Sequence, residues 1–240
     1  MGGDGMLYKY EPHCHTSEGS KCSRIDGASL ARFYKYLGYT GIIITDHFYN
    51  GNTAVPRELP WNEWVAKFTE GYKNAKKEGD RIGIDVFFAW EYSIKGNDFL
   101  IYGLDENWLY EHPDQLGWHY REYMKNVRAD GGMVIHAHPF REAGYIDHIR
   151  LIPRDCDGVE VLNASMQDPE VNRRALWYAD SYKLIKCAGS DNHVGKREHL
   201  GGVYLPERIK SVGEFITLMK SGKGEIFADR YDADNEFMRV

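Results

Sequence analysis

Short apolar runs alternate with amphipathic stretches along the whole chain. The apolar runs are rich in β-branched and aromatic residues, which favour strands, and they span residues 7–15, 41–47, 85–93, 99–104, 132–138, 158–164, 184–190 and 225–230. The amphipathic stretches have helical periodicity and span residues 28–37, 61–77, 116–128, 169–182 and 211–221. Asp26 stands where it can cap the first of them. This alternation predicts an α/β fold.

Several of the apolar runs lack polar alternation, as in Gly-Ile-Ile-Ile at residues 41–44. Strands of this kind suit a parallel sheet that is buried on both faces, and a closed barrel provides such burial. A chain of 240 residues fits one barrel domain. We therefore expect a single-domain, TIM-like barrel over residues 1–240, with a motif-bearing core in about 8–205 and a C-terminal helix and strand in 206–240.

The composition bears on the compartment and the partners. No apolar run reaches the roughly 18 to 20 residues that cross a bilayer, and no basic start followed by an apolar stretch resembles a signal peptide. We expect a cytoplasmic protein with no membrane partner. The four cysteines include no CxxC pair, which favours reduced thiols. The net charge of -6 opposes a broad contact with nucleic acid, so the expected partner is a small anionic substrate.

Histidines and carboxylates recur at the ends of the apolar runs. His13 and His15 flank Cys14, and residues two apart in a strand point to the same side, so both imidazoles can reach one ion while Cys14 points away. A single pair of this kind is weak evidence, because such pairs also arise by chance. The pattern recurs, however, at four further apolar runs, which end in Asp46-His47, Glu91, His136-Ala-His138 and Asp191-Asn-His193.

Ligand-type residues at five strand ends meet on one face if the strands form a barrel. This convergence predicts a divalent-metal site rather than five separate core residues or helix caps. Imidazole and carboxylate ligands fit Zn, Mn or Fe, and their number exceeds the needs of one ion, so two or three ions are expected. Glu91, with two oxygens, is the natural bridge. Because Asp46 and His47 are adjacent, their side chains diverge, and we expect His47 to face the ions and Asp46 to orient an imidazole.

The order of these motifs resembles that of the PHP (polymerase and histidinol phosphatase) family. His-Cys-His-Thr, Ile-Thr-Asp-His, Trp-Glu-Tyr, Ala-His-Pro and Gly-Ser-Asp-Asn-His occur in the family's order between Tyr10 and roughly Val203. The resemblance implies a distorted (β/α)7 barrel around a trinuclear metal site. Carried over by position, it implies one site of His13, His15, Glu91 and Asp191, a second with Glu91 and His138, and a third with His47 and His193.

Two positions depart from the family pattern. Where many members have a histidine before the strand that follows the glutamate, this chain has Asp98, which either ligates or is a hydrated surface residue, and His136 is the alternative ligand. After His15, where relatives supply an aspartate or histidine, the chain reads Thr-Ser-Glu-Gly-Ser-Lys-Cys. Glu18 is the predicted ligand of the third ion and Cys22 is the alternative. If neither ligates, the third site is weak or empty.

The predicted chemistry is the hydrolysis of a phosphate ester. Closely spaced ions can polarise the ester and acidify a water, so that no protein nucleophile is required. Arg141 follows His138-Pro-Phe and is predicted to bind the phosphate and to assist catalysis together with Asp46. Arg197 is a second candidate for substrate binding, and a solvated loop charge is the alternative interpretation of each arginine.

The leading hypothesis is therefore a hydrolase of a small-molecule phosphomonoester or phosphodiester; neither its substrate nor its oligomeric state follows from the sequence. An exonuclease-like phosphodiesterase on short oligonucleotides is the alternative enzyme, which the acidic balance disfavours. A metal-binding regulatory domain with decayed catalysis is the alternative outside enzymes. This alternative would be indicated if the side chains at positions 18 and 98, Glu18 and Asp98, did not serve as metal ligands.

Overall fold

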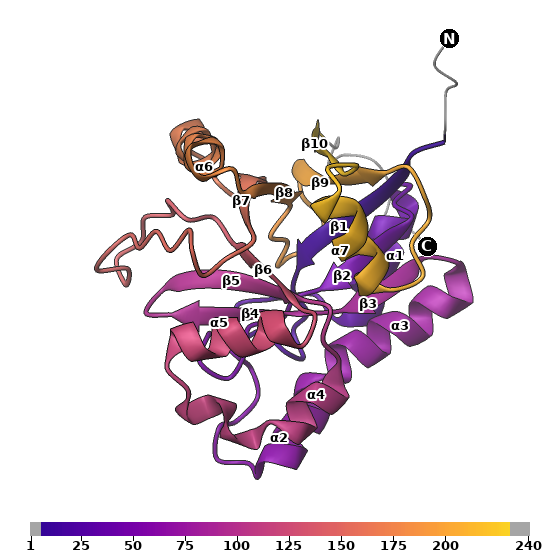
Figure 1. Cartoon of the computed structure of the whole chain (residues 1–240). Coiled ribbons are helices and arrows are strands. Elements are labelled where there is room, and N and C mark those ends of the chain that lie inside the picture. The colour runs from indigo at the N-terminus through magenta and orange to yellow at the C-terminus, as the bar shows by residue number, and fades with distance from the viewer. Residues whose placement is uncertain (1–5, 231–240) are drawn as a thin grey trace.

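The computed structural model of the chain describes residues 6–230, in which helices and strands are interspersed (Figure 1). The strands are β1 (Tyr8–Cys14), β2 (Gly41–Ile44), β3 (Asp85–Phe88), β4 (Trp90–Ile94), β5 (Asn97–Tyr102), β6 (Met133–His136), β7 (Gly158–Asn163), β8 (Ile185–Gly189), β9 (His199–Leu205) and β10 (Glu225–Arg230). The helices are α1 (Gly27–Tyr36), α2 (Trp61–Phe68), α3 (Glu70–Ile82), α4 (Glu106–Glu111), η1 (Pro113–Gly117), α5 (Tyr120–Ala129), α6 (Pro169–Tyr182) and α7 (Val212–Lys220). The α/β class is confirmed.

The strands form two five-stranded sheets. In the first sheet the order is β10-β9-β1-β2-β3, and in the second it is β4-β5-β6-β7-β8. Isolated parallel bridges join the two sheets at two places, His47 with Glu91 and Cys14 with Asn192. Residues 6–230 therefore do not show the closed, TIM-like (β/α)7 barrel that the sequence predicted, but two sheets that meet at these bridges.

Antiparallel pairing accounts for much of this difference. Residues 85–93, predicted as one strand, divide at Ala89 into β3, which is parallel to β2, and β4, which is antiparallel to β5. Lys95 and Gly96 join β4 to β5 with φ angles of 50° and 82°, which suit the tight turn of a hairpin. β5 is also antiparallel to β6, and β9 is antiparallel to both β1 and β10. These pairs have no place in an all-parallel ladder.

The helices agree closely with the amphipathic stretches. Asp26 caps α1, since its side chain accepts a hydrogen bond from Ser29 N at 2.8 Å. Residues 61–77 lie in two helices, α2 and α3, which meet at Thr69 rather than forming one. The predicted C-terminal helix and strand are α7 and β10, while residues 231–240 of the predicted segment lie outside the described residues.

Helices cover the sheets and leave one end of the parallel strands for polar groups. α1 and α3 pack against each other beside the first sheet, and α6 packs on β7 (Figure 1).

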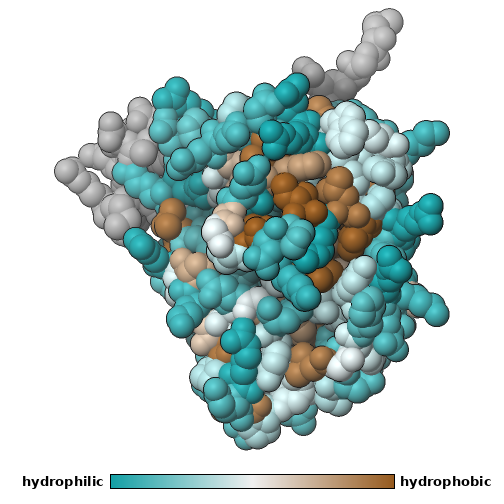
Figure 2. Space-filling model, turned by 90° about the vertical axis from the view of Figure 1, so that its left-hand side faces the viewer, coloured by the Kyte–Doolittle hydropathy of each residue, from teal (hydrophilic) through white to brown (hydrophobic). Residues whose placement is uncertain are grey.

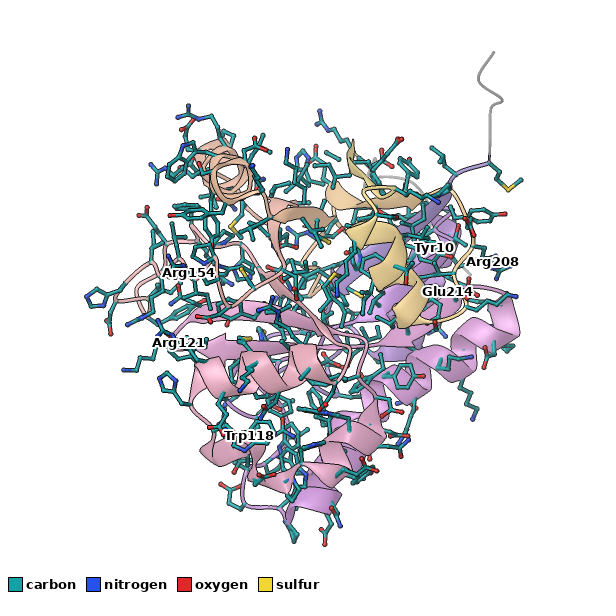
Figure 3. All side chains as sticks on the ribbon, in the orientation of Figure 1. Tyr10, Trp118, Arg121, Arg154, Arg208 and Glu214 are labelled. Carbon is teal, nitrogen blue, oxygen red and sulfur yellow. The ribbon has the colours of Figure 1, made fainter. Side chains whose placement is uncertain are left out.

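Near α7, the Tyr10 hydroxyl accepts a hydrogen bond from Ile209 N at 3.0 Å (Figure 3). On the face to the left of Figure 1, hydrophobic residues gather in an area ringed by hydrophilic ones (Figure 2). No helix within residues 6–230 is long and apolar enough to span a membrane. Buried polar side chains gather beyond the carboxyl ends of β1, β2, β6 and β8.

Candidate metal centre

Two histidines at the end of β1 begin the site. His13 and His15 are fully buried, and their Nε2 atoms lie 3.1 Å apart. Cys14 between them belongs to an apolar cluster on the other side of the strand, where its thiol donates to Ile43 O at 3.4 Å. The strand alternation thus brings both imidazoles to one side and turns the thiol away, as the sequence predicted.

Glu91 lies at the centre of the surrounding imidazoles. Its Oε1 is 3.3 Å from His138 Nε2 and 3.5 Å from His13 Nε2. Its Oε2 is 2.7 Å from His47 Nδ1 and 3.6 Å from His15 Nε2. The residue is fully buried, and neither oxygen is counted in a hydrogen bond, although His47 Nδ1 approaches Oε2 to 2.7 Å. Such an arrangement suits lone pairs that converge on ions between the side chains.

Asp191 reaches the same centre from the segment after β8. Its Oδ1 lies 3.3 Å from His15 Nε2, 3.5 Å from His13 Nε2 and 3.3 Å from His193 Nδ1. Its Oδ2 lies 3.8 Å from His138 Nε2. Asp191 and His138 both have positive φ angles, 50° and 27°, which are unfavourable for residues with a side chain. Backbone conformations of this kind concentrate at functional sites.

Asp98 joins the site from β5. It pairs with Ser93 of β4 in the antiparallel ladder, accepts a hydrogen bond from the Ser93 hydroxyl, and is only 5% exposed. Its Oδ2 lies 4.0 Å from His138 Nε2. Burial and the charge of Glu91 raise the pKa of Asp98. The structure therefore places Asp98 in the cluster and not among hydrated surface residues.

Together these side chains form overlapping groups whose ligand atoms lie within 4.8 Å of one another. Within the described part of the chain there are four such groups: His13, His15 and Glu91; His13, His138 and Asp191; Glu91, Asp98 and His138; and His15, His47 and His193. The shared members make this one connected cluster of potential ligands and not four separate groups.

The charges of the site perturb one another. Burial alone would raise the pKa of Glu91, but the imidazoles, His47 above all, hold it well below its ordinary value. Burial likewise opposes a charge on Asp191, and His13 foremost among its neighbours keeps the pKa of this carboxyl well below its ordinary value. Burial and two neighbouring imidazoles lower the pKa of His15 well below its ordinary value. These directions favour a charged Glu91, a charged Asp191 and a neutral His15, the forms in which such groups bind metal. Against the effect of burial, the carboxylates raise the pKa values of His13, His47 and His138.

A layer of hydrogen bonds behind the cluster orients the imidazoles. The Glu160 carboxylate accepts from His13 Nδ1 at 2.8 Å and from His138 N at 3.1 Å. The Ser20 hydroxyl lies 3.0 Å from His15 Nδ1 and donates to Asp46 Oδ1 at 2.7 Å. Asp46 thus contacts His15 through Ser20. A carboxylate that holds a histidine in this way fixes its tautomer and ring orientation.

The sequence alone did not indicate Glu160 or Ser20 as parts of the site. Glu160 stands in the apolar run 158–164, where a fully buried acidic residue needs a partner. Glu11 has a similar place in β1, where it accepts hydrogen bonds from His13 N and Ser190 N at 2.8 and 3.0 Å, and burial raises its pKa to about 7. The signal that could have found both glutamates is an acidic residue inside an apolar run.

Glu18, the predicted ligand of the third ion, is not brought to the cluster. Its carboxylate accepts hydrogen bonds from Gly27 N at 3.2 Å and from Asn74 Nδ2 at 3.0 Å. It therefore lies at the amino end of α1, where the helix dipole favours an anion. The prediction that Glu18 joins the third ion's ligands is therefore wrong, because its carboxylate is held at the start of α1.

His136, the alternative to Asp98, is not brought to the cluster either. Its ring stacks on Phe99 with centroids 4.4 Å apart and meets the edge of Tyr178 at 6.0 Å. Neither ring nitrogen has a hydrogen-bond partner, and burial lowers the pKa of His136 to about 3. Although His136 and His138 are two residues apart, their side chains do not share one direction, because the backbone leaves the strand conformation at His138.

Cys22, the alternative to Glu18, faces the cluster. Its thiol interacts with the side chains of His193 and His47. Cys22 is exposed as a residue, but partial burial of its thiol would raise the thiol pKa, and the two imidazoles outweigh this and lower it to about 6.

A cavity of about 1050 Å³ opens over the cluster, lined in part by Asp98, Arg141, Asp191 and Arg197. Burial opposes the charge of Arg141, but Asp191 foremost among the nearby acids raises its pKa. The Arg141 guanidinium stands 5.8 Å from the centroid of the Tyr145 ring. Arg197 instead donates through Nη1 to Ser165 Oγ and to Asp191 O, the latter at 3.2 Å. Arg141 is thus the arginine with more freedom to meet an anion, while Arg197 also supports the Asp191 backbone.

The sequence matches no protein-family model and no curated protein, but the fold matches solved structures. A two-domain protein from Bacteroides vulgatus that contains a predicted PHP-like metal-dependent phosphoesterase aligns with a TM-score of 0.66 at 15% identity, over 93% of this chain and 66% of that one. This chain shares the fold. A candidate metal-dependent phosphoesterase from Bifidobacterium adolescentis aligns at 0.52 and 16% identity, over 77% and 87%. An amidohydrolase from Chromobacterium violaceum with bound sulfate and no metal aligns at 0.55 and 15% identity, over 94% and 99%.

Proposed function

We propose that the chain is a PHP-family hydrolase that uses two or three divalent ions, Zn, Mn or Fe, to cleave a small-molecule phosphomonoester or phosphodiester. Its structural neighbours include proteins described as PHP-like or metal-dependent phosphoesterases, and the third is a hydrolase. The motifs that resemble the family in sequence are the residues that meet in the cluster. The fold and the ligand set thus support the same class of enzyme.

The unpartnered carboxylate of Glu91 carries this proposal. Both of its oxygens are buried among imidazoles without a hydrogen bond, and a buried unsatisfied polar group costs about 1 to 3 kcal/mol, or more when it is charged. Divalent ions held by Glu91 and the neighbouring histidines would satisfy these oxygens. The residues present therefore fit a polynuclear metal centre.

Each part of the site has a role in this proposal. The cluster residues His13, His15, His47, Glu91, Asp98, His138, Asp191 and His193 hold the ions. Ions bound there supply Lewis-acid polarisation of the ester and acidify water. Asp46 supports His15 through Ser20, Arg141 binds the phosphoryl oxygens in the cavity, and Arg197 contacts the substrate beside Asp191.

Metal analysis of the purified full-length chain tests the centre. We expect two or more Zn, Mn or Fe ions per chain, and one ion or none would rule out a polynuclear site. Asp191→Ala should lower the metal content. His148→Ala is the matched control, because His148 is exposed and lies outside the cluster, and it should leave the content unchanged.

Hydrolysis assays test the chemistry. With Mn²⁺ added, the wild-type chain should hydrolyse a generic aryl phosphate or bis-aryl phosphate, and Asp191→Ala and His15→Ala should abolish this activity while His148→Ala retains it. Turnover of short oligonucleotides alone would favour the exonuclease-like alternative. A full complement of ions with no hydrolysis of any phosphate ester would favour a metal-binding regulatory domain.

A further inference from the structure

Cys22 lies in a turn after β1 whose backbone is held by hydrogen bonds both before and after this residue. Lys21 N donates to Asn52 O at 2.9 Å, and Arg24 N donates to His193 O at 2.8 Å. The Ser23 hydroxyl adds a bond to His193 O at 3.2 Å. The backbone on either side of Cys22 is thus fixed, and one of its anchors is the segment that carries His193.

Cys22 lies beside imidazoles of the cluster. It lines the same cavity as His47 and His193, and its chain neighbours Ser23 and Arg24 donate hydrogen bonds to His193 O. The third imidazole, His15, stacks on His193 with ring centroids 4.1 Å apart and lies 4.6 Å from the His47 ring. Cys22 is therefore not an isolated cysteine but a neighbour of three gathered imidazoles.

The group of His15, His47 and His193 is incomplete as a metal site. It is the one group of the four, within residues 6–230, whose own members include no carboxylate. The nearest carboxylates, Glu91 Oε2 at 2.7 Å from His47 Nδ1 and Asp191 Oδ1 at 3.3 Å from His193 Nδ1, belong to the other groups. A divalent ion held by three protein nitrogens has a fourth tetrahedral position free for another ligand.

Two acidic residues near this turn are engaged elsewhere. Glu18 accepts from Gly27 N and Asn74 Nδ2, away from the cluster. Asp46 accepts from Thr16 N at 2.7 Å and from the Ser20 hydroxyl at 2.7 Å. Cys22 is the side chain of the turn that faces the imidazoles and can supply a negative charge.

We propose that Cys22 is the fourth ligand of an ion held by His15, His47 and His193, which makes this a three-histidine, one-thiolate site suited to Zn²⁺. Binding forms a sulfur–metal bond and releases the thiol proton to solvent. The sulfur stands outside the four groups, so ligation requires it to move inward, and the exposed side chain of Cys22 is open to a change of rotamer. The inference rests on the proposed metal centre but not on its hydrolytic activity.

Alkylation of the thiol gives a readout that is independent of catalysis. The full-length chain is stripped of metal with a chelator, divided, and treated with iodoacetamide with or without Zn²⁺, and the modified peptide is quantified by mass spectrometry. Cys14, Cys156 and Cys187 are buried, so labelling reports on Cys22. We expect Zn²⁺ to slow the alkylation of Cys22 by about tenfold or more, as for a thiolate occupied as a ligand.

Cobalt substitution tests the sulfur–metal bond directly. The Co²⁺-loaded wild type should show a sulfur-to-cobalt charge-transfer band in the near ultraviolet, and Cys22→Ser should lack the band and lose one bound ion. Lys21→Ala is the matched control, because it changes the exposed neighbour in the same turn, and it should keep the band. Cys22→Asp should restore the ion without restoring the band.

The outcomes separate this inference from the proposed function. If Zn²⁺ binds with full stoichiometry while Cys22 is alkylated at the metal-free rate and no charge-transfer band appears, the thiolate ligand is excluded and the polynuclear centre stands. If the wild-type chain binds no ion, both proposals fail together. Protection of Cys22 without phosphate hydrolysis would support the ligand and contradict the enzyme.

Discussion

The Glu160 carboxylate accepts a hydrogen bond from His13 Nδ1 at 2.8 Å. Because a carboxylate can only accept, Nδ1 carries the proton in this pair. In the neutral ring the lone pair is then on Nε2, which lies 3.5 Å from both Glu91 Oε1 and Asp191 Oδ1. Glu160 therefore decides which nitrogen of His13 is offered to an ion.

Replacing Glu160 should weaken metal binding without removing a ligand. Glu160→Gln removes the charge that holds His13, and loss of such a partner lowers metal affinity by about 10- to 100-fold. Competition with a chromogenic chelator measures the change. Glu170→Gln is the control, because Glu170 is on α6 and pairs with Arg173 away from the cluster. Equal affinities of Glu160→Gln and wild type would show that His13 needs no such support.

Glu91 and Asp98 should differ in how many ions they hold. Glu91 belongs to two of the ligand groups and Asp98 to one. Glu91→Ala should therefore reduce the bound metal by more than one ion per chain, whereas Asp98→Asn should lose at most one. Elemental analysis of both variants, purified in parallel, measures this. The bridging role of Glu91 fails if the two variants retain the same number of ions.

Ser20→Ala should destabilise the metal-free protein. The Ser20 hydroxyl accepts from His47 N at 2.9 Å, contacts His15 Nδ1 and donates to Asp46, all of them buried. Leaving such groups unpaired costs about 1 to 3 kcal/mol in the free energy of unfolding. Urea denaturation in the presence of chelator gives the value. Ser17→Ala, an exposed serine in the same segment, serves as the control and should be close to wild type.

The cap of α1 gives a prediction about pH. Partial burial raises the pKa of Asp26, but hydrogen bonds from the Ser29 N–H and hydroxyl outweigh this and lower it. The charged cap thus stabilises the fold above the pKa of about 3.9 that an unfolded aspartate has, and this contribution is lost as the pH falls through the lower folded pKa. Asp26→Ala should cost about 1 kcal/mol at neutral pH.

The difference between wild type and Asp26→Ala should begin to narrow below about pH 4, where the unfolded carboxylate binds protons while the folded one is still charged, and it should vanish below the lower folded pKa. Urea titrations of both proteins between neutral and acidic pH measure this dependence. Asp26→Asn keeps a capping oxygen without the charge and should show a weaker dependence. A difference that stays constant down to the pH at which the fold is lost would contradict a charged cap.

The residues that meet in the cluster could be predicted from sequence because their positions follow from local rules. Strand alternation places His13 and His15 on one side of β1, and the carboxyl ends of β2, β6 and β8 bring His47, His138 and Asp191 to the same region. These inferences need only that the strand ends converge. They do not need a closed barrel, which is why the cluster forms although the strands are divided between two sheets.

The remaining features depend on contacts between distant residues. Glu18 lies close to His15 in sequence, but its carboxylate accepts a hydrogen bond from the backbone at the amino end of α1. The apolar pattern does not indicate whether neighbouring strands are parallel or antiparallel, because hydrophobic residues favour both. It therefore could not predict that β4 and β5 form an antiparallel hairpin. Glu160 reaches His13 across 147 positions of the chain, a distance over which no local pattern specifies a partner.

The two bridges between the sheets, His47 with Glu91 and Cys14 with Asn192, lie beside the residues that would hold the ions. An ion shared by His13 of the first sheet and Glu91 of the second would fasten one half of the molecule to the other. Occupancy and folding would then be a single linked equilibrium, in which chelation loosens the seam between the halves and each bound ion shifts the chain toward its assembled form.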